Sequence, residues 1–241
     1  MSRCLEGMNV VFLCGGLGKR LRPAVSDKPK VLADINGKPF VGILIDNLSR
    51  FGIKDIILSI GYKKESIRDY FQKRCAPGGY SIVFSEEENP LGTGGALKKA
   101  KPLVKSSSFL VLNGDSFCAI DYEKFLNFHQ KKKALVSIAI VKTQGYEDAG
   151  SVTLNDKDVI VDFNEKGAVA NGYINAGVYI FNKQAFSLMP EKCSFSLEYD
   201  FFPKLAGKSL YGYVSESRFI DIGTPQRYEK AKRFFCEGGR P

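Results

Sequence analysis

The sequence predicts an α/β fold with three layers, α/β/α, in which helices cover both faces of a mostly parallel sheet. Apolar runs and segments of helical periodicity alternate up to about residue 145, which is typical of repeated strand–helix–strand units. Several of the apolar runs are continuous, as in strands that are buried on both faces. The chain of 241 residues is long enough to form one large α/β domain.

The elements of the first half follow one another in a regular order. The first strand covers residues 9–13, a β-branched and apolar run that ends at glycines. A helix follows over residues 39–51, where the apolar residues recur at close to a helical period. The remaining strands are predicted over residues 54–60, 80–84, 109–112 and 135–141, and the remaining helices over residues 63–73, 94–101 and 122–131.

The pattern changes after about residue 145, where short strands dominate. These strands are predicted over residues 150–154, 159–164 and 176–181, and helical segments follow near residues 197–205 and 226–235. No low-complexity linker and no internal repeat divides the chain. We therefore expect a single Rossmann-like domain over residues 1–241, with one half at about 1–145 and the other at about 146–241.

The charge balance favours an anionic partner. The sequence has 35 Lys and Arg against 26 Asp and Glu, a formal net charge of +9. Nucleic acid and a polyphosphate substrate both satisfy this requirement. The basic residues are scattered and no motif that reads nucleic acid is present, so we expect a polyphosphate and no nucleic acid.

The cysteine and histidine patterns exclude several kinds of site. The six cysteines form no CxxC pair and no zinc spacing, so we expect reduced thiols in a cytoplasmic protein. His129 is the only histidine and falls in a helical segment, where we expect it at the surface. A His-based metal site or Ser–His–Asp triad is therefore disfavoured. No run of about 18 apolar residues occurs, so no membrane span is expected.

A glycine-rich loop follows the first strand, at residues 13–21, with the sequence LCGGLGKRL. Glycines let backbone N–H groups approach a ligand, and the adjacent Lys19 and Arg20 supply charge for phosphate oxygens. Two familiar motifs do not fit. The dinucleotide fingerprint needs glycine at Leu21, and the P-loop needs Ser or Thr at Arg20. Taken alone, such a turn is more often structural than functional.

The continuation of this loop, LCGGLGKRLRPAVSDKPKVLADINGKPF, spans residues 13–40. It resembles the signature of the sugar nucleotidyltransferase family, GGxGTRLxPxTxxxPKPxxxxxxKP. Lys19 stands where the family has Thr, and Val31 stands where it has Pro. The matching residues are Gly15, Gly16, Gly18, Arg20, Leu21, Pro23, Pro29, Lys30, Lys38 and Pro39.

The resemblance continues along nearly the whole chain. It includes PLGTGGA at residues 90–96, NGD at 113–115, FNEK at 163–166, NAGVY at 175–179 and FIDIGTP at 219–225. The last segment is similar to the family's WxDIGTP, with Phe219 in place of Trp. The resemblance implies a GT-A-like nucleotidyltransferase fold, with a nucleotide-binding half first and a sugar-phosphate-binding half second.

The implied reaction is attack by a sugar 1-phosphate oxygen on the α-phosphate of a nucleoside triphosphate, with pyrophosphate as the leaving group. The substrate phosphate is the nucleophile, so catalysis rests on positioning and electrostatics. Arg20, Lys30 and Asp115 are implied as catalytic residues, and Asp115 with Asp221 as the ligands of Mg²⁺. Each Asp could instead cap a turn or helix.

The resemblance also assigns binding residues. The implied nucleotide-binding residues are Leu13, Gly15, Gly16, Gly18, Lys19, Arg20, Gly92, Thr93, Gly94 and Gly95. The implied sugar-phosphate-binding residues are Asn113, Gly114, Glu165, Lys166, Asn175 and Gly177. The nucleotide base is expected between the first loop and residues 91–96, where glycines would let it approach the backbone. One carboxylate of residues 86–88 could accept hydrogen bonds from guanine, although consecutive acids are more often solvated.

Within the family, the chain is most similar to the branch of D-glycero-D-manno-heptose 1-phosphate guanylyltransferases, which make GDP-heptose for bacterial surface polysaccharide. GTP and this heptose phosphate are therefore the expected substrates. Mannose-1-phosphate guanylyltransferases and small uridylyltransferases share most of the motifs and remain alternatives. A non-catalytic sugar-nucleotide-binding regulator and a nucleotide-dependent dehydrogenase are alternatives from other classes. A homodimer is expected only on general grounds.

Overall fold

A nine-stranded sheet forms the centre of the computed structural model, which describes residues 3–72, 79–142, 151–164 and 172–237. Four strands of the first half are parallel and lie in the order β6–β1–β4–β5. They are β1 (Asn9–Leu13), β4 (Asp55–Ile60), β5 (Ser81–Glu86) and β6 (Ser108–Asn113).

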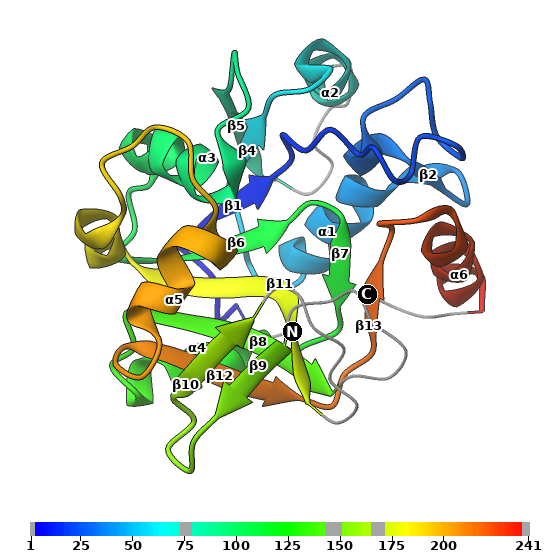
Figure 1. Cartoon of the computed structure of the whole chain (residues 1–241). Helices are drawn as coiled ribbons and strands as arrows, with labels where there is room; N and C mark the ends of the chain where they lie inside the picture. Colours follow the sequence, from blue (N-terminus) through cyan, green and yellow to red (C-terminus); the bar gives the residue numbers. More distant parts are fainter. Residues whose placement is uncertain (1–2, 73–78, 143–150, 165–171, 238–241) are drawn as a thin grey trace.

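The second half joins this sheet through β11 (Tyr173–Asn182), which pairs antiparallel with β6 (Figure 1). β11 also pairs antiparallel with β8 and β9. The other strands on this side are β8 (Val136–Lys142), β9 (Ser151–Leu154), β10 (Ile160–Asn164) and β12 (Leu210–Ser215). The long strand β11 therefore connects the two halves of the chain.

Two small ribbons lie beside the main sheet. β7 (Ser116–Cys118) pairs antiparallel with β13 (Phe219–Asp221), and β2 (Asp34–Ile35) pairs with β3 (Lys38–Pro39). The helices are α1 (Phe40–Ser49), α2 (Lys64–Gln72), α3 (Gly92–Ala100), α4 (Tyr122–Lys131), α5 (Phe202–Leu205) and α6 (Pro225–Cys236). A π-helical turn, Leu197–Phe201, precedes α5.

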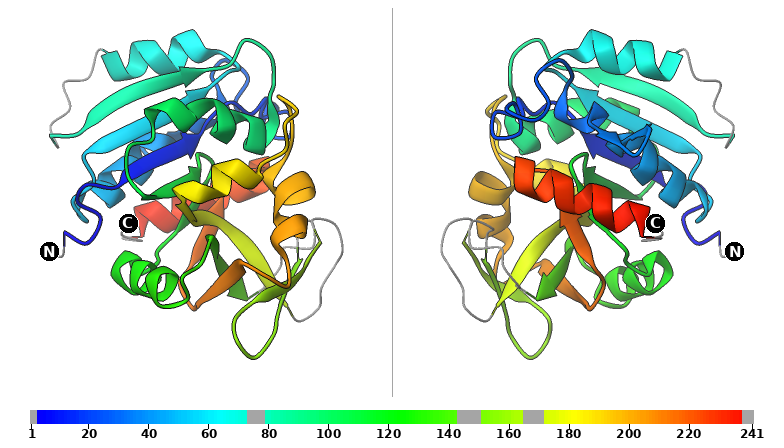
Figure 2. Two further views of the ribbon diagram at one scale, coloured as in Figure 1. Left: turned by 90° about the vertical axis from the view of Figure 1, so that its left-hand side faces the viewer. Right: turned by 90° about the vertical axis from the view of Figure 1, so that its right-hand side faces the viewer.

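Helices lie on both sides of the sheet (Figure 2). Successive strand residues point to opposite faces, so β1 contributes to two apolar layers. Val10 and Phe12 pack in one layer with residues of α1, α2, α4 and α6, whereas Val11 packs in the other with residues of α3, the π-turn and α5. The predicted three-layer α/β/α class is confirmed.

The strands and helices predicted for the first half are present, with ends shifted by a few residues. The predicted helix over residues 197–205 is a π-turn followed by the short α5. β7 and β12 were not predicted. β7 has three residues, and β12 itself contains two Tyr, a Gly and a Ser, so their apolar pattern is weak, and pairing with a neighbouring strand decides their conformation.

The prediction that His129 lies at the surface is wrong. Its side chain is buried beneath α4, where Nδ1 lies 2.9 Å from Ser137 Oγ on β8. The cysteines that the structure describes are free thiols. Along the described part of the chain, none of the helices has the length and apolar character needed to cross a membrane.

Candidate active site

A cavity of about 270 Å³ opens at the carboxyl ends of β1 and β6. Open α/β sheets bind ligands at this edge, because the loops that follow parallel strands meet there. The lining residues are Leu13, Cys14, Gly15, Gly16, Leu17, Lys30, Val31, Glu87, Pro90, Gly92, Thr93, Ala96, Asn113 and Asp115. The fold therefore gathers the first loop, the second loop and the end of β6 around one space.

The first glycine-rich loop leaves β1 along one wall of the cavity. No atom of the described residues lies within 4 Å of the position that a Cβ on Gly16 would occupy, so this backbone is open to a ligand. Gly18 has a φ of +59° and packs against Lys30, a conformation that favours glycine. Gly18, Lys19 and Arg20 lie beyond the residues that line the cavity.

Lys30 and Asp115 form an ion pair at the floor of the cavity. Lys30 Nζ donates to Asp115 Oδ2 at 2.5 Å, and Ser116 Oγ donates to Asp115 Oδ1 at 3.1 Å. Burial alone would raise the pKa of Asp115, but Lys30 and these hydrogen bonds hold it below its usual value. Asp115 is therefore a carboxylate at neutral pH, and Lys30 carries its positive charge into the site.

The ribbon of β7 and β13 brings Asp221 next to Asp115. Asp221 pairs with Ser116 in the ribbon, and the N–H of Ile222 donates to the carbonyl oxygen of Asp115 at 3.0 Å. Burial raises the pKa of Asp221, and the charge of Asp115 adds to that effect. The structure thus brings together two carboxylates that are separated by 106 positions in the sequence (221 − 115).

Two arginines lie on the Asp221 side. Arg227 Nη1 is 3.4 Å from Asp221 Oδ2, and the N–H of Gly223 donates to Asp221 Oδ1 at 2.7 Å. A Cβ on Gly223 would lie 3.5 Å from Arg20 Nη2. Arg20 is therefore beside the Asp221 turn, although it lies outside the cavity lining.

The two carboxylates suit a magnesium ion. Mg²⁺ in nucleotide enzymes is held by one or two carboxylates and completes its coordination with water and substrate phosphates. Among the described residues no group of three or more His, Cys, Asp or Glu side chains surrounds a common point.

The second loop divides into a part that faces the cavity and a part that packs against the protein. Gly92 and Thr93 line the cavity. The N–H groups of Gly94 and Gly95 both donate to the carbonyl oxygen of Phe195, at 3.0 and 3.1 Å. A Cβ on Gly94 would lie 2.2 Å from the Phe195 ring. We expected these two glycines to face the nucleotide, whereas the structure directs them toward residues 193–195.

Only Glu87 of the three consecutive glutamates enters the cavity. It is 6% exposed, and its Oε2 accepts a hydrogen bond from the Leu91 N–H at 3.0 Å. Burial raises its pKa, against this hydrogen bond and the charge of Lys99. Glu86 pairs with Lys64 and Arg68, and Glu88 is exposed.

On the side that the sequence assigns to the sugar phosphate, β6 contributes Asn113 to the cavity lining, and β11 packs against this residue. Asn175 Nδ2 donates to the hydroxyl of Tyr179 at 2.8 Å, and Asn175 Oδ1 accepts from the Gly177 N–H at 2.9 Å. Gly177 has a φ of +70°, and a Cβ there would lie 2.9 Å from Asn113 Nδ2. Asn113 Oδ1 is a buried acceptor, and no described residue donates a hydrogen bond to it, so a ligand hydroxyl could satisfy it.

Some of the expected residues do not line the cavity, and others lie outside the residues that the structure describes. Gly114 packs against Cys14 and Val31, because a Cβ there would lie within 3 Å of both side chains. Glu165 and Lys166 lie outside the described residues. Sequence reasoning gave no role to Tyr179 and Glu198, which bond to Asn175 and Thr93, since these contacts depend on the pairing of β11 and on the π-turn.

An open parallel sheet with a glycine-rich loop, a basic residue and paired carboxylates at its carboxyl edge defines a phosphate-transferring nucleotide enzyme. The chain belongs to the nucleotidyl transferase family, whose profile matches residues 9–238. This confirms the predicted family and enzyme class, so the dehydrogenase alternative no longer stands.

Two curated relatives span nearly the whole chain. D-glycero-alpha-D-manno-heptose 1-phosphate guanylyltransferase of Aneurinibacillus thermoaerophilus is 42% identical over 94% of this chain and 97% of its own length. The enzyme of the same name from Campylobacter jejuni is 36% identical over 92% of this chain and 97% of its own length. Both are similar to this chain from end to end.

A solved structure has the same fold. HddC from Yersinia pseudotuberculosis, complexed with GMP-PN, superposes with a TM-score of 0.85 at 38% identity, covering 95% of this chain and 99% of HddC. A putative glucose-1-phosphate thymidylyltransferase from Bacillus anthracis, at 19% identity and a TM-score of 0.82, shares the fold. The GT-A-like nucleotidyltransferase fold is thereby confirmed.

Proposed function

We propose that this protein condenses GTP with D-glycero-D-manno-heptose 1-phosphate, giving GDP-heptose and pyrophosphate. The observation that carries the choice of base is Glu87, a buried carboxylate that faces the cavity. Guanine presents an N1–H and an amino group side by side, and a carboxylate accepts from both. The choice of sugar follows the relatives that are 42% and 36% identical and bear this name.

Glu87 is held where it can read the edge of a base. A Cβ on Gly15 would lie 2.8 Å from Glu87 Oε1, so this oxygen lies directly against the first loop. Its other oxygen accepts from Leu91 N–H of the second loop. The carboxylate therefore stands between the two loops that the sequence assigns to the base. A buried acceptor left without guanine donors would disfavour other bases.

The triphosphate is assigned to the first loop. Gly15 and Gly16 offer accessible backbone, and Gly18, Lys19 and Arg20 extend the same loop toward the Asp221 turn. Lys30 neutralises charge at the α-phosphate, where its Nζ already faces the cavity beside Asp115. The sugar 1-phosphate oxygen forms a bond to the α-phosphorus while the bond to pyrophosphate breaks, so the protein supplies orientation and charge.

Asp115 and Asp221 are the residues that would hold Mg²⁺. The negative charge of Asp115 contributes to the raised pKa of Asp221, and a bound cation would relieve this repulsion. When bound, Mg²⁺ would neutralise the phosphate oxygens of both substrates. Arg227 contacts Asp221 and orients its carboxylate.

The sugar hydroxyls are assigned to Asn113 at the end of β6, against which β11 packs. Asn113 offers an unsatisfied acceptor, and Asn175 holds the Tyr179 hydroxyl beside it. Glu165 and Lys166 are proposed for the sugar phosphate from the FNEK motif alone. The first half of the domain thus binds the nucleotide and the second half binds the sugar phosphate. These substrates require no membrane or nucleic acid, and we propose a cytoplasmic enzyme. We also propose a homodimer, because two-fold symmetric dimers are the commonest protein oligomers.

A second candidate is a mannose-1-phosphate guanylyltransferase. The protein of that name from Mycobacterium tuberculosis is 31% identical over 97% of this chain, which spans 66% of that relative. The lower identity, 31% against 42% and 36%, favours the heptose substrate.

The test combines each of the four nucleoside triphosphates with the 1-phosphates of heptose, mannose and glucose in the presence of Mg²⁺. The rate of pyrophosphate release is measured for each combination, with the wild type and with Glu87→Gln. We expect GTP with heptose 1-phosphate to give the highest kcat/KM. Glu87→Gln should lower kcat/KM for GTP about 10²-fold and that for ATP much less, because the lost bonds are made only by guanine.

Glu88→Gln is the matched control, since this neighbour is exposed and should retain the preference for GTP. A wild type that prefers UTP or CTP would rule out the guanylyltransferase. An unchanged preference in Glu87→Gln would remove Glu87 from base recognition. Absence of turnover in every combination of triphosphate and sugar 1-phosphate would favour the non-catalytic regulator.

A further inference from the structure

Glu198 lies in the π-turn before α5 and connects the two halves of the chain. Glu198 is 9% exposed. Glu198 Oε2 accepts a hydrogen bond from Thr93 Oγ1 at 2.5 Å and a second from Ser196 Oγ at 2.7 Å. Thr93 is 105 positions earlier in the chain and lines the cavity, so this contact reaches the candidate nucleotide site.

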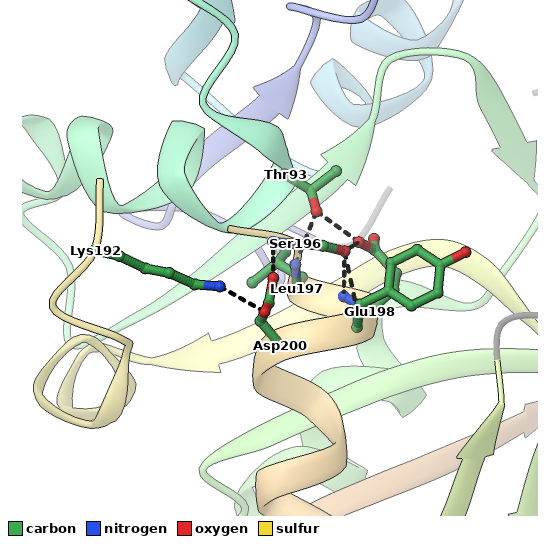
Figure 3. Close-up of polar contacts among 7 residues, drawn as sticks. Thr93, Lys192, Ser196, Leu197, Glu198 and Asp200 are labelled. Atoms are coloured by element: carbon green, nitrogen blue, oxygen red, sulfur yellow. Dashed lines mark hydrogen bonds and ion pairs between the residues drawn. The ribbon is translucent and has the colours of Figure 1, made fainter. Parts of the chain in front are cut away.

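The hydroxyls of Thr93 and Ser196 both contact the Glu198 carboxylate (Figure 3). Thr93 Oγ1 accepts from the Leu197 N–H at 2.9 Å, which leaves its proton for the carboxylate. Ser196 Oγ accepts from the N–H groups of Glu198 and Tyr199, at 3.1 and 3.2 Å. Each hydroxyl is thus a donor fixed by backbone groups, and one carboxylate oxygen receives both.

The backbone around this contact is equally tied to the second loop. The carbonyl oxygen of Phe195 accepts from Gly94 and Gly95, and the Phe195 N–H donates to the carbonyl oxygen of Leu91 at 2.9 Å. A Cβ on Gly92 would lie 2.6 Å from that same Phe195 oxygen. The first turn of α3 therefore rests on residues 195–198, and its glycines permit this close approach.

Glu198 is also close to the sugar side. Burial raises the pKa of Tyr179, and the negative charge of Glu198 raises it further. Tyr179 accepts a hydrogen bond from Asn175. The Glu198 carboxylate therefore bonds to Thr93, which lines the cavity, and its charge acts on Tyr179 of β11.

We propose that Glu198 is a positioning residue, which fixes Thr93 and the second nucleotide loop and thereby sets the affinity for the nucleoside triphosphate. The inference rests on the proposed nucleotide site but on neither the base nor the sugar. Hydrogen bonds to an ionised acceptor are roughly twice as strong as neutral ones, so a carboxylate holds the two hydroxyls more firmly than an amide would. The π-turn supplies the geometry, because it aims Glu198 at α3 while Tyr199 remains exposed.

The experiment compares the wild type with Glu198→Gln, Thr93→Val and Thr93→Ser, and with the double variant of Glu198→Gln and Thr93→Val. We expect Glu198→Gln to raise KM for the triphosphate about tenfold while kcat changes less than about threefold, since binding rather than chemistry is affected. Thr93→Val should have a similar effect, and Thr93→Ser should restore the wild-type KM because it keeps the hydroxyl.

The double variant decides whether the two residues act together. We expect its KM to equal that of the more affected single variant, because each change breaks the same contact. Asp200→Asn is the matched control. It removes the same charge from the same turn, and Asp200 bonds to Lys192 and the Ser196 N–H without contacting Thr93. Its KM for the triphosphate should stay at the wild-type value.

Two results would overturn the proposal. One is a melting temperature that falls in Glu198→Gln while KM stays at the wild-type value, which would give Glu198 a purely structural role. The other is a double variant whose KM rises by the product of the single effects, which would make the two residues independent.

A direct measurement of triphosphate binding separates this proposal from the proposed function. Calorimetry measures Kd for whichever of the four triphosphates the wild type binds most tightly. A wild type without GTP-dependent turnover would therefore contradict the substrates, while the ratio of Kd values between Glu198→Gln and the wild type would still test Glu198. A ratio near one contradicts the positioning role, and a ratio of about ten supports it.

Discussion

At the scale of single residues, Asp115 and Asp221 differ in what holds them. Asp115 is paired with Lys30 at 2.5 Å, and Asp221 accepts the Gly223 N–H and contacts Arg227. If both hold Mg²⁺, Asp115→Asn and Asp221→Asn should each lower kcat about 10²–10³-fold, as expected for loss of one electrostatic contact to the reacting phosphate. Pyrophosphate release at saturating substrates measures this loss.

The metal role has its own signature. Asp221→Asn should raise the Mg²⁺ concentration for half-maximal rate, because the amide still accepts from Gly223 but offers no charge to the ion. Asp156→Asn, an exposed change in the β9–β10 hairpin, should alter neither quantity. Near-normal kcat and an unchanged Mg²⁺ requirement in either variant would remove that residue from the metal site.

At the scale of elements, the first turn of α3 depends on glycines for packing. A Cβ on Gly95 would lie 2.3 Å from the carbonyl oxygen of Cys193, which is backbone and has little room to move. Gly95→Ala gains helix propensity of about 1 kcal/mol, but overpacking of this kind costs about 1–3 kcal/mol. We expect a lower melting temperature in thermal denaturation, with the steric cost outweighing the gain.

Gly16→Ala provides the contrast within the same site. Within the part of the chain that the structure describes, no atom lies within 4 Å of the added Cβ, so the melting temperature should stay at the wild-type value while KM for the triphosphate rises. A stable Gly95→Ala variant with an impaired KM would return Gly95 to the nucleotide-binding role that the sequence suggested.

The same elements show how far the sequence alone could lead. Strands 9–13 and 54–60 were readable because continuous apolar runs belong to buried parallel strands. The roles of Gly94 and Gly95 were not readable, because a glycine that approaches a ligand and one that approaches another backbone have the same sequence pattern. Glu87 could not be separated from Glu86 and Glu88 until strand β5 and its neighbours fixed which side chain turns inward.

At the scale of the whole molecule, two apolar layers on opposite faces of one sheet hold both halves together. The motif spacing could predict which segments meet at the carboxyl edge, because parallel strands bring their following loops to one side. It could not predict contacts such as Thr93 with Glu198, since these depend on the antiparallel return of β11 and on a π-turn. Long-range side-chain contacts thus required the folded chain.

The stability of the whole molecule should report on its single histidine. Burial lowers the pKa of His129 from 6.5 to about 4, so the folded chain keeps the ring neutral. Between these two values the unfolded chain binds a proton that the folded chain does not bind. The contribution of His129 is therefore fully present above pH 6.5 and is lost as the pH falls toward 4.

His129→Gln removes this titration and can still bond to Ser137 Oγ. From pH 7 to pH 5.5, the free energy of unfolding of the wild type should fall about 1 kcal/mol more than that of the variant. Urea denaturation at each pH measures the difference, and equal m-values ensure that the same surface is exposed. Parallel pH profiles for the two proteins would mean that the His129 ring is protonated within the fold, which would contradict its burial as a neutral group.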